Sequence, residues 1–458
     1  MALKVEVYQK EKVRPSSPTP KTLRSHKLCL LDMMVGNFYH PFVFFYNSGA
    51  GPGRHDYDEL KESLSKTLSV LYPLAGRIKD RSTIDCNDEG ADFVRANVTN
   101  TDLAEFLRRH PKLEHLRQLL PLDPYPNAID PAQPMLAVQV NRFRCGGTAV
   151  GFCTWHGVAD AGGMTGMLNT LAAINRGEEP TNSGGGLVVD ATAIFPPGNF
   201  AIFLQSMSNN AAVAPPKRKH YTSKRFVFSK QDIERLRRNQ SDHSDMKHHR
   251  RPSRVEALSA FLWAAVIRAT LLANPSLKAH LLTHVVNLRK KLNPPLPSHC
   301  LGNINQVTRA GWKVVAGAGA GQRVTAESLV GRVVEAIDKV TNEYVREMHV
   351  EGGYLRAILA HSKEYDNKDE TKMLRITSVC KFPFGEVDFG WGKPIRIGMG
   401  HKLEDLALFW DTEDGGIEVS VGLEDEVMWN LDKDMEFHAY VSFAQIVSES
   451  SCPQRSAL

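Results

Sequence analysis

A histidine with an aspartate four residues later follows an apolar stretch of the chain. Residues 148–155 are apolar and β-prone, a pattern that predicts a buried strand. His156 comes next, a glycine after it predicts a turn, and Asp160 follows. A strand end would hold the backbone while the imidazole faces a cleft and accepts a proton near neutral pH. The pattern predicts a general base, although a histidine simply packed at a strand end would look the same, and a second His-x-x-x-Asp occurs at His401 and Asp405.

A second segment combines an acid, two aromatic residues and two glycines. From Asp388 to Gly392 the chain reads Asp-Phe-Gly-Trp-Gly. Glycine permits tight turns and close backbone approach, and the two aromatic side chains are large enough to anchor such a turn. A carboxylate so close to these rings needs a partner, because burying an unpaired charge is costly. The segment therefore predicts a structured turn held by its own aromatic side chains.

Together the two segments resemble the paired signature of the plant BAHD acyltransferases, which move an acyl group from coenzyme A to an alcohol or amine. The resemblance covers nearly the whole chain and is closest to the alkaloid- and terpenoid-acylating members. Further matching segments lie at residues 15–20, 31–32, 72–77, 85–88, 145–149, 253–260, 286–289, 293–297 and 302–303.

The resemblance implies an α/β fold of two pseudo-symmetric domains, the chloramphenicol acetyltransferase-like fold of coenzyme A-dependent acyltransferases, with a solvent channel between the domains. We expect an N-terminal domain at residues 1–195, a crossover loop at 196–219 and a C-terminal domain at 220–458. A segment near residues 375–398 is a candidate for packing with the N-terminal domain. His156 would lie at the interface and be reached from the channel.

The resemblance also implies roles for individual residues. His156 would be the general base, and Thr377 a candidate contact for the oxyanion. Asp160 could orient the imidazole, but in the family the matching acid pairs with the arginine at Arg289, and we favour that structural role. Structural support is further expected from Asp388, Gly390, Trp391 and Gly392, coenzyme binding from Ser253, Gly302 and Asn303, and contact with the acceptor from Asp32 and Val379. No metal site and no permanently bound cofactor are expected.

The chain departs from the family in two places. Relatives usually carry Thr-Ser-Trp where this chain has Thr377-Ser378-Val379, and the smaller valine should widen the acceptor pocket. This predicts a short donor, acetyl-CoA by preference, and a bulky alcohol such as an alkaloid or terpenoid. The runs 217–224 and 242–251 are also unusually rich in basic residues and histidine. A run such as 247–251 is usually a solvated face, but at a channel mouth it could attract the phosphates of the coenzyme.

Composition limits the classes of protein that fit. At 458 residues the chain is too long for one core, and a net charge of +5 suits an anionic small ligand better than nucleic acid. The seven cysteines are odd in number and lack metal-ligand spacing, which favours reduced thiols. No signal peptide is evident, and the apolar run 261–273 is too short to span a bilayer. We expect a soluble, cytoplasmic monomer, and the glycine-rich run 317–321 as a surface loop, not a dinucleotide site.

These residues need a scaffold, and the hydrophobic pattern predicts one. A strand is expected at the N-terminus, an amphipathic helix at 58–71, a hairpin at 135–143 and 148–155, and a helix from Asp160 to residue 175 that ends before Gly177. The second half should hold a strand at 224–228, a helix at 230–238, a helix that begins with a capping box at Ser253, and a strand at 281–287. We further expect a long helix at 326–346, strands at 375–380, 395–399, 406–411 and 416–422, and a closing helix at 432–448.

Three other functions share the same motifs. A non-catalytic binding protein on this scaffold is one, although His156 is intact. An acyl-CoA hydrolase would transfer the acyl group to water, and an N-acyltransferase would use an amine acceptor. The products of a reaction with acetyl-CoA would separate all three from an O-acyltransferase.

Overall fold

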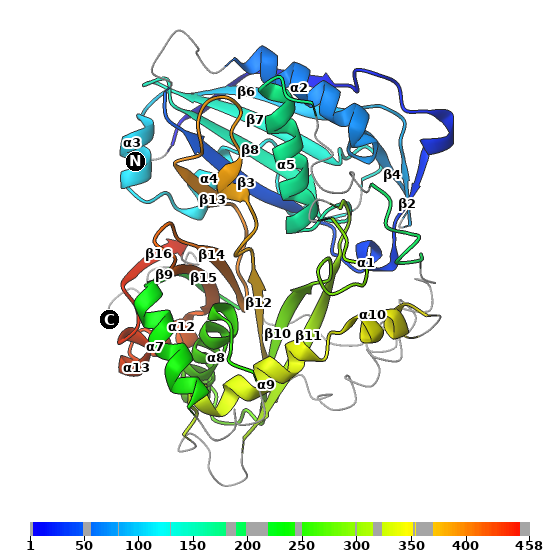
Figure 1. The fold of residues 1–458 in the computed structure, drawn as a ribbon. Helices are drawn as coiled ribbons and strands as arrows, with labels where there is room; N and C mark the ends of the chain where they lie inside the picture. Colours follow the sequence, from blue (N-terminus) through cyan, green and yellow to red (C-terminus); the bar gives the residue numbers. More distant parts are fainter. Residues whose placement is uncertain are drawn as a thin grey trace. The chain divides into compact units, whose positions relative to one another are not determined.

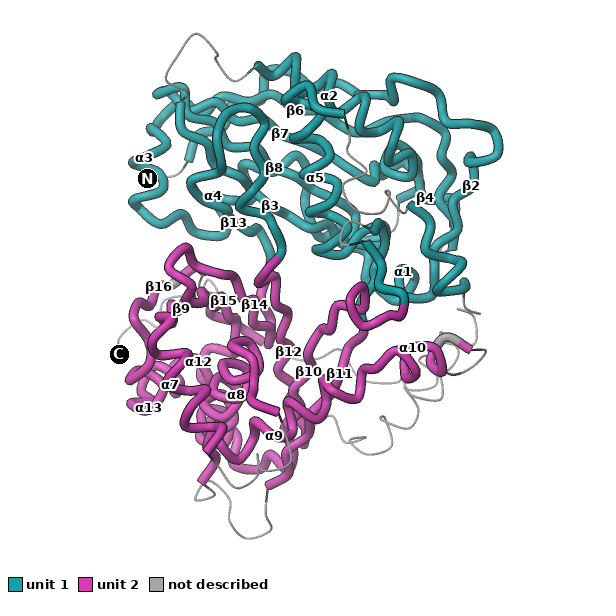
Figure 2. The backbone as a smooth tube through the Cα atoms, viewed as in Figure 1, with its two compact units in different colours: residues 1–206, 294–305, 382–401 teal, residues 207–293, 306–381, 402–458 magenta. Residues whose placement is uncertain are grey.

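The chain forms two compact units, shown in separate colours in Figure 2. The computed structural model describes residues 3–48, 56–80, 82–128, 130–179, 189–197, 219–242, 250–297, 300–314, 323–350, 353 and 370–448. Unit 1 is Met1–Ser206, Pro294–Asn305 and Phe382–His401; unit 2 is Met207–Asn293, Gln306–Lys381 and Lys402–Leu458. Two stretches of the C-terminal half thus belong to unit 1, and one of them, residues 294–305, falls within the range expected for the C-terminal domain. Residues 198–218, most of the expected crossover, lie outside the described residues.

Unit 1 is built on a mixed six-stranded sheet in the order β1-β6-β7-β8-β3-β13. Its strands are β1 Val5–Val13, β3 Tyr39–Tyr46, β6 Ala91–Val98, β7 Leu136–Phe143, β8 Thr148–Trp155 and β13 Arg396–Met399. All neighbours are antiparallel except β6 and β7. The expected hairpin is present as β7 and β8, and β8 ends immediately before His156. The strand β13 comes from far along the sequence and pairs with β3 at the edge of this sheet.

Two long helices, α2 Tyr57–Val70 and α5 Ala161–Asn175, pack together and lie along one face of this sheet (Figure 1). In α2, the expected amphipathic helix, Leu60, Leu64 and Leu68 recur at every fourth position and are buried. Asp160 caps α5 by accepting a hydrogen bond from the Gly163 amide, and the helix ends before Gly177, which takes a positive φ. Smaller elements are β2 Ser25–Lys27, β4 Arg77–Asp80, β5 Thr83–Asp85, α1 Leu30–Met33, α3 Leu103–Arg108, α4 Leu113–Gln118 and the 3₁₀ turns Lys21–Leu23, Tyr72–Ala75 and Phe384–Glu386.

Unit 2 contains a mixed seven-stranded sheet in the order β11-β10-β12-β14-β15-β9-β16. Its strands are β9 Tyr221–Phe228, β10 Ala279–Asn287, β11 Asn305–Lys313, β12 Thr371–Ser378, β14 Leu406–Asp411, β15 Ile417–Glu424 and β16 Phe443–Ser448. The pairs β10–β12 and β12–β14 are parallel, and those from β14 through β15 and β9 to β16 are antiparallel. Its helices are α7 Lys230–Ser241, α8 Arg254–Ala273, α9 Ala326–Asp338, α10 Asn342–His349, α12 Asp425–Leu431 and α13 Met435–His438.

The central helix of unit 2 is α8, which begins with the expected capping box. The Ser253 side chain accepts from the Glu256 amide, and the Glu256 carboxylate accepts from the Ser253 amide. Among the described helices, α8 is long and apolar enough to cross a membrane by length and composition. However, most of α8 is buried inside the molecule, where it packs against α7, α9 and α12. This burial is what a core helix shows.

Two expected elements are wrong. The helix expected at 326–346 is two helices, because Thr341 accepts a hydrogen bond from the Tyr344 amide and so caps a new helix, α10. The closing helix expected at 432–448 is instead the short α13 followed by β16, which adds to the edge of the sheet beside β9. Pairing with β9 satisfies backbone groups of Phe443–Ser448, and this tertiary pairing overrides the helical pattern of the local sequence.

Candidate active site

The backbone of His156 is held from two sides. Its amide donates to the Phe38 carbonyl over 2.9 Å, and its carbonyl accepts from the Asn303 side-chain amide over 2.7 Å. The chain then turns at Gly157, where a β-carbon would lie 2.3 Å from the Trp155 ring, so a larger residue would require that ring to move. The end of β8 therefore presents the imidazole from a fixed backbone.

Two rings pack against the His156 imidazole. The His40 ring lies 3.9 Å away between centroids at an interplanar angle of 37°, and the Phe38 ring lies 4.8 Å away in an edge-on arrangement. The His401 ring lies 6.0 Å from the His40 ring between centroids, and His401 Nδ1 is 2.7 Å from the Tyr125 hydroxyl oxygen. We call His40, His156 and His401 the histidine row. Sequence reasoning missed the row, although a histidine inside the apolar strand β3 was a signal that could have pointed to it.

Strand register explains the row. In the β3–β8 pair His40 lies opposite Thr154, so His156, two residues on, is its diagonal neighbour on the same face. In the β13–β3 pair Met399 lies opposite Phe42, and continuing this register places His401 opposite His40. The Gly400 amide donates to the Pro41 carbonyl over 2.8 Å, which keeps that register beyond the end of β13. Three segments remote in sequence thus bring one imidazole each to the same edge of unit 1.

All three imidazoles favour the uncharged form. Burial lowers the pKa of His156 below its ordinary 6.5, against smaller opposing effects from its own carbonyl, from Asp160, from the Asn303 side chain and from Asp32. Burial, followed by repulsion from the other two histidines, holds the pKa of His40 well below its usual range. Burial, then His156 and Arg117, lower the pKa of His401 to about 3. At neutral pH His156 is therefore unprotonated, the form a general base requires.

We expect the acid limb of the pH profile of kcat/KM to lie below pH 6.5. With His156 as the expected general base, the uncharged imidazole would be the active form, so a lowered pKa would keep it competent below the ordinary value and activity would be lost only when the pH reaches the lowered pKa. Initial rates at subsaturating acceptor, measured from pH 5 to pH 9 in buffers of constant ionic strength, would test this. An acid limb at or above pH 6.5 would contradict it.

Asp160 joins the His156 turn to the segment around residue 303. One of its carboxylate oxygens accepts from the Gly163 amide over 2.9 Å, and the other accepts from the Ile304 amide over 3.0 Å. The Asp160 amide donates back to the Gly302 carbonyl, and Gly302 takes a positive φ of 105°. With only 7% of its surface exposed, Asp160 has the contacts of a structural carboxylate.

Asn303 and Asp32 are likewise tied to this turn. Asp32 caps α1 by accepting from the Cys29 amide over 3.0 Å. Its other oxygen accepts from the Asn303 backbone amide over 2.7 Å and from the Asn303 side chain over 3.0 Å. These bonds connect α1 through Asn303 to the carbonyl of His156. The expected roles of Asn303 in coenzyme binding and of Asp32 in acceptor binding stay predictions, while the structure shows Asn303 holding the His156 carbonyl and Asp32 holding Asn303.

The Asp-Phe-Gly-Trp-Gly segment is a self-capped turn in unit 1. The Asp388 carboxylate accepts from the amides of Gly390 and Gly392 over 2.8 and 2.9 Å, and both glycines take positive φ values. The Trp391 ring meets Tyr46 edge-on at 5.6 Å between centroids. Three side chains hold the backbone of this segment. The Tyr46 hydroxyl of β3 donates to the Val387 carbonyl, Asn175 at the end of α5 donates to the Phe389 carbonyl, and Arg176, the C-cap of α5, donates to the Asp388 carbonyl. These contacts support the structural role expected for this segment.

The remaining expected site residues belong to unit 2. Thr377 is half-buried near the end of β12. The buried Val379 follows, and its amide donates a hydrogen bond to the Phe409 carbonyl. Ser253 caps α8 and is exposed, and the buried Arg289 donates to the Asn287 side chain. The expected pair of Arg289 with Asp160, and the expected approach of Thr377, Ser253 and Val379 to the reacting groups, stay predictions.

The basic run near α8 is partly neutralised. Arg250 contacts Glu256 at 2.6 Å and Asp338 at 2.8 Å, and Arg251 pairs with Glu234. Residues 243–249 and the run 317–321 lie outside the described residues. The two described arginines are therefore engaged by carboxylates of their own unit, which weakens the expectation that they attract a phosphate.

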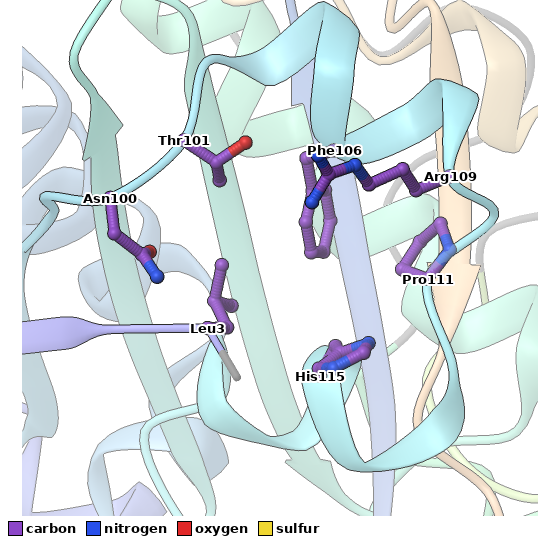
Figure 3. Close-up of a pocket in the computed structure, with 7 residues that line it drawn as sticks. All are labelled: Leu3, Asn100, Thr101, Phe106, Arg109, Pro111 and His115. Atoms are coloured by element: carbon purple, nitrogen blue, oxygen red, sulfur yellow. The ribbon is translucent and has the colours of Figure 1, made fainter. Parts of the chain in front are cut away.

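A small hollow of about 50 Å³ lies away from the histidine row, between the start of β1 and the helices α3 and α4 (Figure 3). It is lined by Leu3, Asn100, Thr101, Phe106, Arg109, Pro111 and His115. The Arg109 guanidinium contacts Glu105 at 2.6 Å, and His115 Nδ1 accepts from the Lys112 amide. A hollow this small with its polar groups engaged does not suit a coenzyme or a bulky alcohol.

The fold of this chain, two mixed α/β units, resembles that of a solved protein. The crystal structure of vinorine synthase superposes with a TM-score of 0.76 at 30% identity, covering 96% of this chain and 98% of that one. The expected acyltransferase fold is thereby confirmed, while the channel between the domains stays a prediction.

Sequence comparison identifies the family. Residues 3–438 match the model of the Transferase family. The chain is 32% identical over 443 residues to limonoid 21-O-acetyltransferase of Melia azedarach, covering 96% of this chain and 99% of that relative. It is 32% identical over 441 residues to vinorine synthase of Rauvolfia serpentina, covering 93% and 96%. The chain belongs to the Transferase family, the BAHD acyltransferases, and is an acyltransferase.

Proposed function

We propose that the protein transfers an acyl group, acetyl by preference, from acyl-CoA to a hydroxyl group of a bulky plant alcohol of the alkaloid or terpenoid class. The observation that carries this proposal is the buried His156 imidazole, presented from a backbone that Phe38 and Asn303 hold, with a pKa that burial lowers. The relatives named above support the reaction, since one is a limonoid O-acetyltransferase. A chain with this base in this family is best explained as an O-acyltransferase.

The proposed reaction needs one base and no covalent intermediate. His156 Nε2 takes the proton of the acceptor hydroxyl as its oxygen attacks the thioester carbonyl. The tetrahedral intermediate collapses, the carbon–sulfur bond breaks, and the thiolate of coenzyme A takes the proton from His156. Such assistance is worth ~10²–10⁴-fold. Cys153, the nearest cysteine in sequence, is fully buried in β8 and burial raises its pKa to about 12, so it is unsuited to be a nucleophile.

The two substrates would be bound by different residues. Thr377 would donate to the oxyanion, Ser253, Gly302 and Asn303 would contact the donor, and Asp32 and Val379 would face the acceptor. Acyl-CoA would enter as a co-substrate, with no permanently bound cofactor. We further propose a cytoplasmic monomer; the six described cysteines, all free thiols, favour a reducing compartment.

Replacing Val379 by tryptophan should raise KM for bulky acceptors far more than for small ones. An indole in place of an isopropyl group narrows only the acceptor side, so KM for acetyl-CoA should change little. Steady-state kinetics with one small and one polycyclic alcohol would measure this difference. Equal losses for both alcohols, or a matching rise in KM for acetyl-CoA, would show that position 379 does not line the acceptor pocket.

The proposal is tested by incubating the protein with acetyl-CoA and a panel of alcohols and amines, and reading both free thiol and product mass. Acetylation of an alcohol supports it. An amide product would favour an N-acyltransferase. Thiol release without any acceptor would favour a hydrolase, and the absence of thiol release would favour a non-catalytic binding protein.

A further inference from the structure

We propose that His40 positions the His156 imidazole for proton transfer by packing its own ring directly against it. The inference rests on the proposed function, because it assigns a partner to the base of that reaction. His40 would be a positioning residue, acting on the substrate only through His156.

The first step concerns what orients the His156 ring. Its Nδ1 is buried and, within the described part of the chain, no group meets it with the distance and angle of a hydrogen bond. In a Ser-His-Asp triad a carboxylate on this nitrogen fixes the ring. Here the Asp160 oxygens accept from the amides of Gly163 and Ile304. Among the described residues, the ring contacts with His40 and Phe38 can therefore fix its rotation, beside the weaker interactions of the imidazole with its own carbonyl and with the Asn303 side chain.

The second step concerns what fixes His40 itself. It lies near the start of β3, which is flanked by β8 and the edge strand β13, and only 9% of its surface is exposed. Its Nε2 is 3.2 Å from the carbonyl of Ala159, which belongs to the same turn as His156. This hydrogen bond requires Nε2 to carry the proton, so it also selects the tautomer of His40. His40 is thus bound to the turn it supports, and a shift of the turn would disturb both contacts together.

The third step concerns charge. When His156 takes the acceptor proton it becomes an imidazolium beside the His40 ring, and a second charge at this distance would oppose the transfer. Burial keeps His40 uncharged, and the neighbouring His401 is uncharged for the same reason. An uncharged aromatic ring instead attracts a cation near its face. His40 can therefore hold the base without raising the cost of protonating it.

Three substitutions separate the ring from the hydrogen bond: His40→Phe keeps a ring, His40→Gln keeps a polar hydrogen-bonding group, and His40→Leu keeps neither. We expect His40→Leu and His40→Gln to lower kcat by ~10–10²-fold, the scale of a misplaced catalytic group, with KM for acetyl-CoA changed less than about threefold. His40→Phe should stay within about fivefold of wild type. The acid limb of the pH profile should move by less than about half a unit in the variants, because an uncharged ring is removed.

The matched control is His26→Leu, which removes an equally buried imidazole of unit 1 that packs edge-on against Tyr72. Its kcat should match wild type, and Tm should be recorded for every variant. The inference is overturned if His40→Leu retains kcat within about twofold while His156→Ala is inactive. It is also overturned if the loss of kcat across the His40 variants simply follows their loss of Tm, or if His40→Phe loses as much kcat as His40→Gln. A shift of the acid limb to higher pH by more than about one unit would overturn it as well, because His40 would then act through its charge. Retained activity in His156→Ala would instead refute the proposed function.

Discussion

Replacing His156 by alanine is expected to lower kcat by ~10²-fold or more while the protein remains folded. The proposed reaction has one group that can take the hydroxyl proton, and the variant removes it. The backbone bonds from His156 to Phe38 and Asn303 do not involve its side chain, so the turn should persist. Steady-state kinetics with acetyl-CoA and a responsive alcohol, together with Tm, would measure both effects.

His156→Gln serves as the companion variant, since it keeps most of the side-chain volume beside His40 and lacks a base of suitable pKa. Both variants should lose kcat to a similar extent. A purified variant with more than about a tenth of wild-type kcat would show that His156 is not the general base.

Replacing Asp160 by alanine should have the largest effect on stability, about 3 kcal/mol, with a loss of activity that follows from it. The change removes the cap of α5, which lowers the free energy of unfolding by ~0.5–2 kcal/mol. It also leaves the buried Ile304 amide without its charged acceptor, which lowers that free energy by a further ~1.5–3 kcal/mol. Asp388→Ala should cost less, about 1–2 kcal/mol, because the glycines whose amides it holds are exposed. Denaturant unfolding and Tm would measure the difference.

Asp160→Asn is the matched control, because asparagine is as good a helix cap as aspartate and lacks only the charge. It should recover part of the lost stability. If Asp160→Ala lost all activity at an unchanged Tm, Asp160 would have a direct part in the chemistry, as in the alternative in which it orients the imidazole.

The local features of the site could be predicted because each depends on neighbouring residues. The strand before His156, the cap at Asp160, the glycine at the end of α5 and the capping box at Ser253 are decided by side chains within a few positions of one another. The histidine row could not be predicted in this way. It depends on the register of β3 with β8 and with β13, and β13 lies some 350 residues further along the chain.

The same limit explains the two wrong helices. The pattern at 432–448 fits a helix locally, but Phe443–Ser448 pairs with β9, more than 200 residues earlier in the sequence. The pattern at 326–346 hides a break, because apolar spacing continues across Thr341 while the threonine side chain starts a new helix. For the site, this means that His156 could be proposed as the base from the sequence, whereas the rings and amides that hold it required the fold.

The central claim is direct, histidine-dependent transfer from acyl-CoA to an alcohol, and one measurement tests it most directly. Thiol released from acetyl-CoA and acetylated alcohol formed should be quantified in the same reaction, with and without the alcohol, and the intact mass of the protein recorded. We expect one acetylated product for each thiol released, no thiol release without the alcohol and no acetyl group on the protein. Thiol release that does not need the alcohol, or an acetylated protein that transfers its acetyl group to the alcohol, would contradict the account.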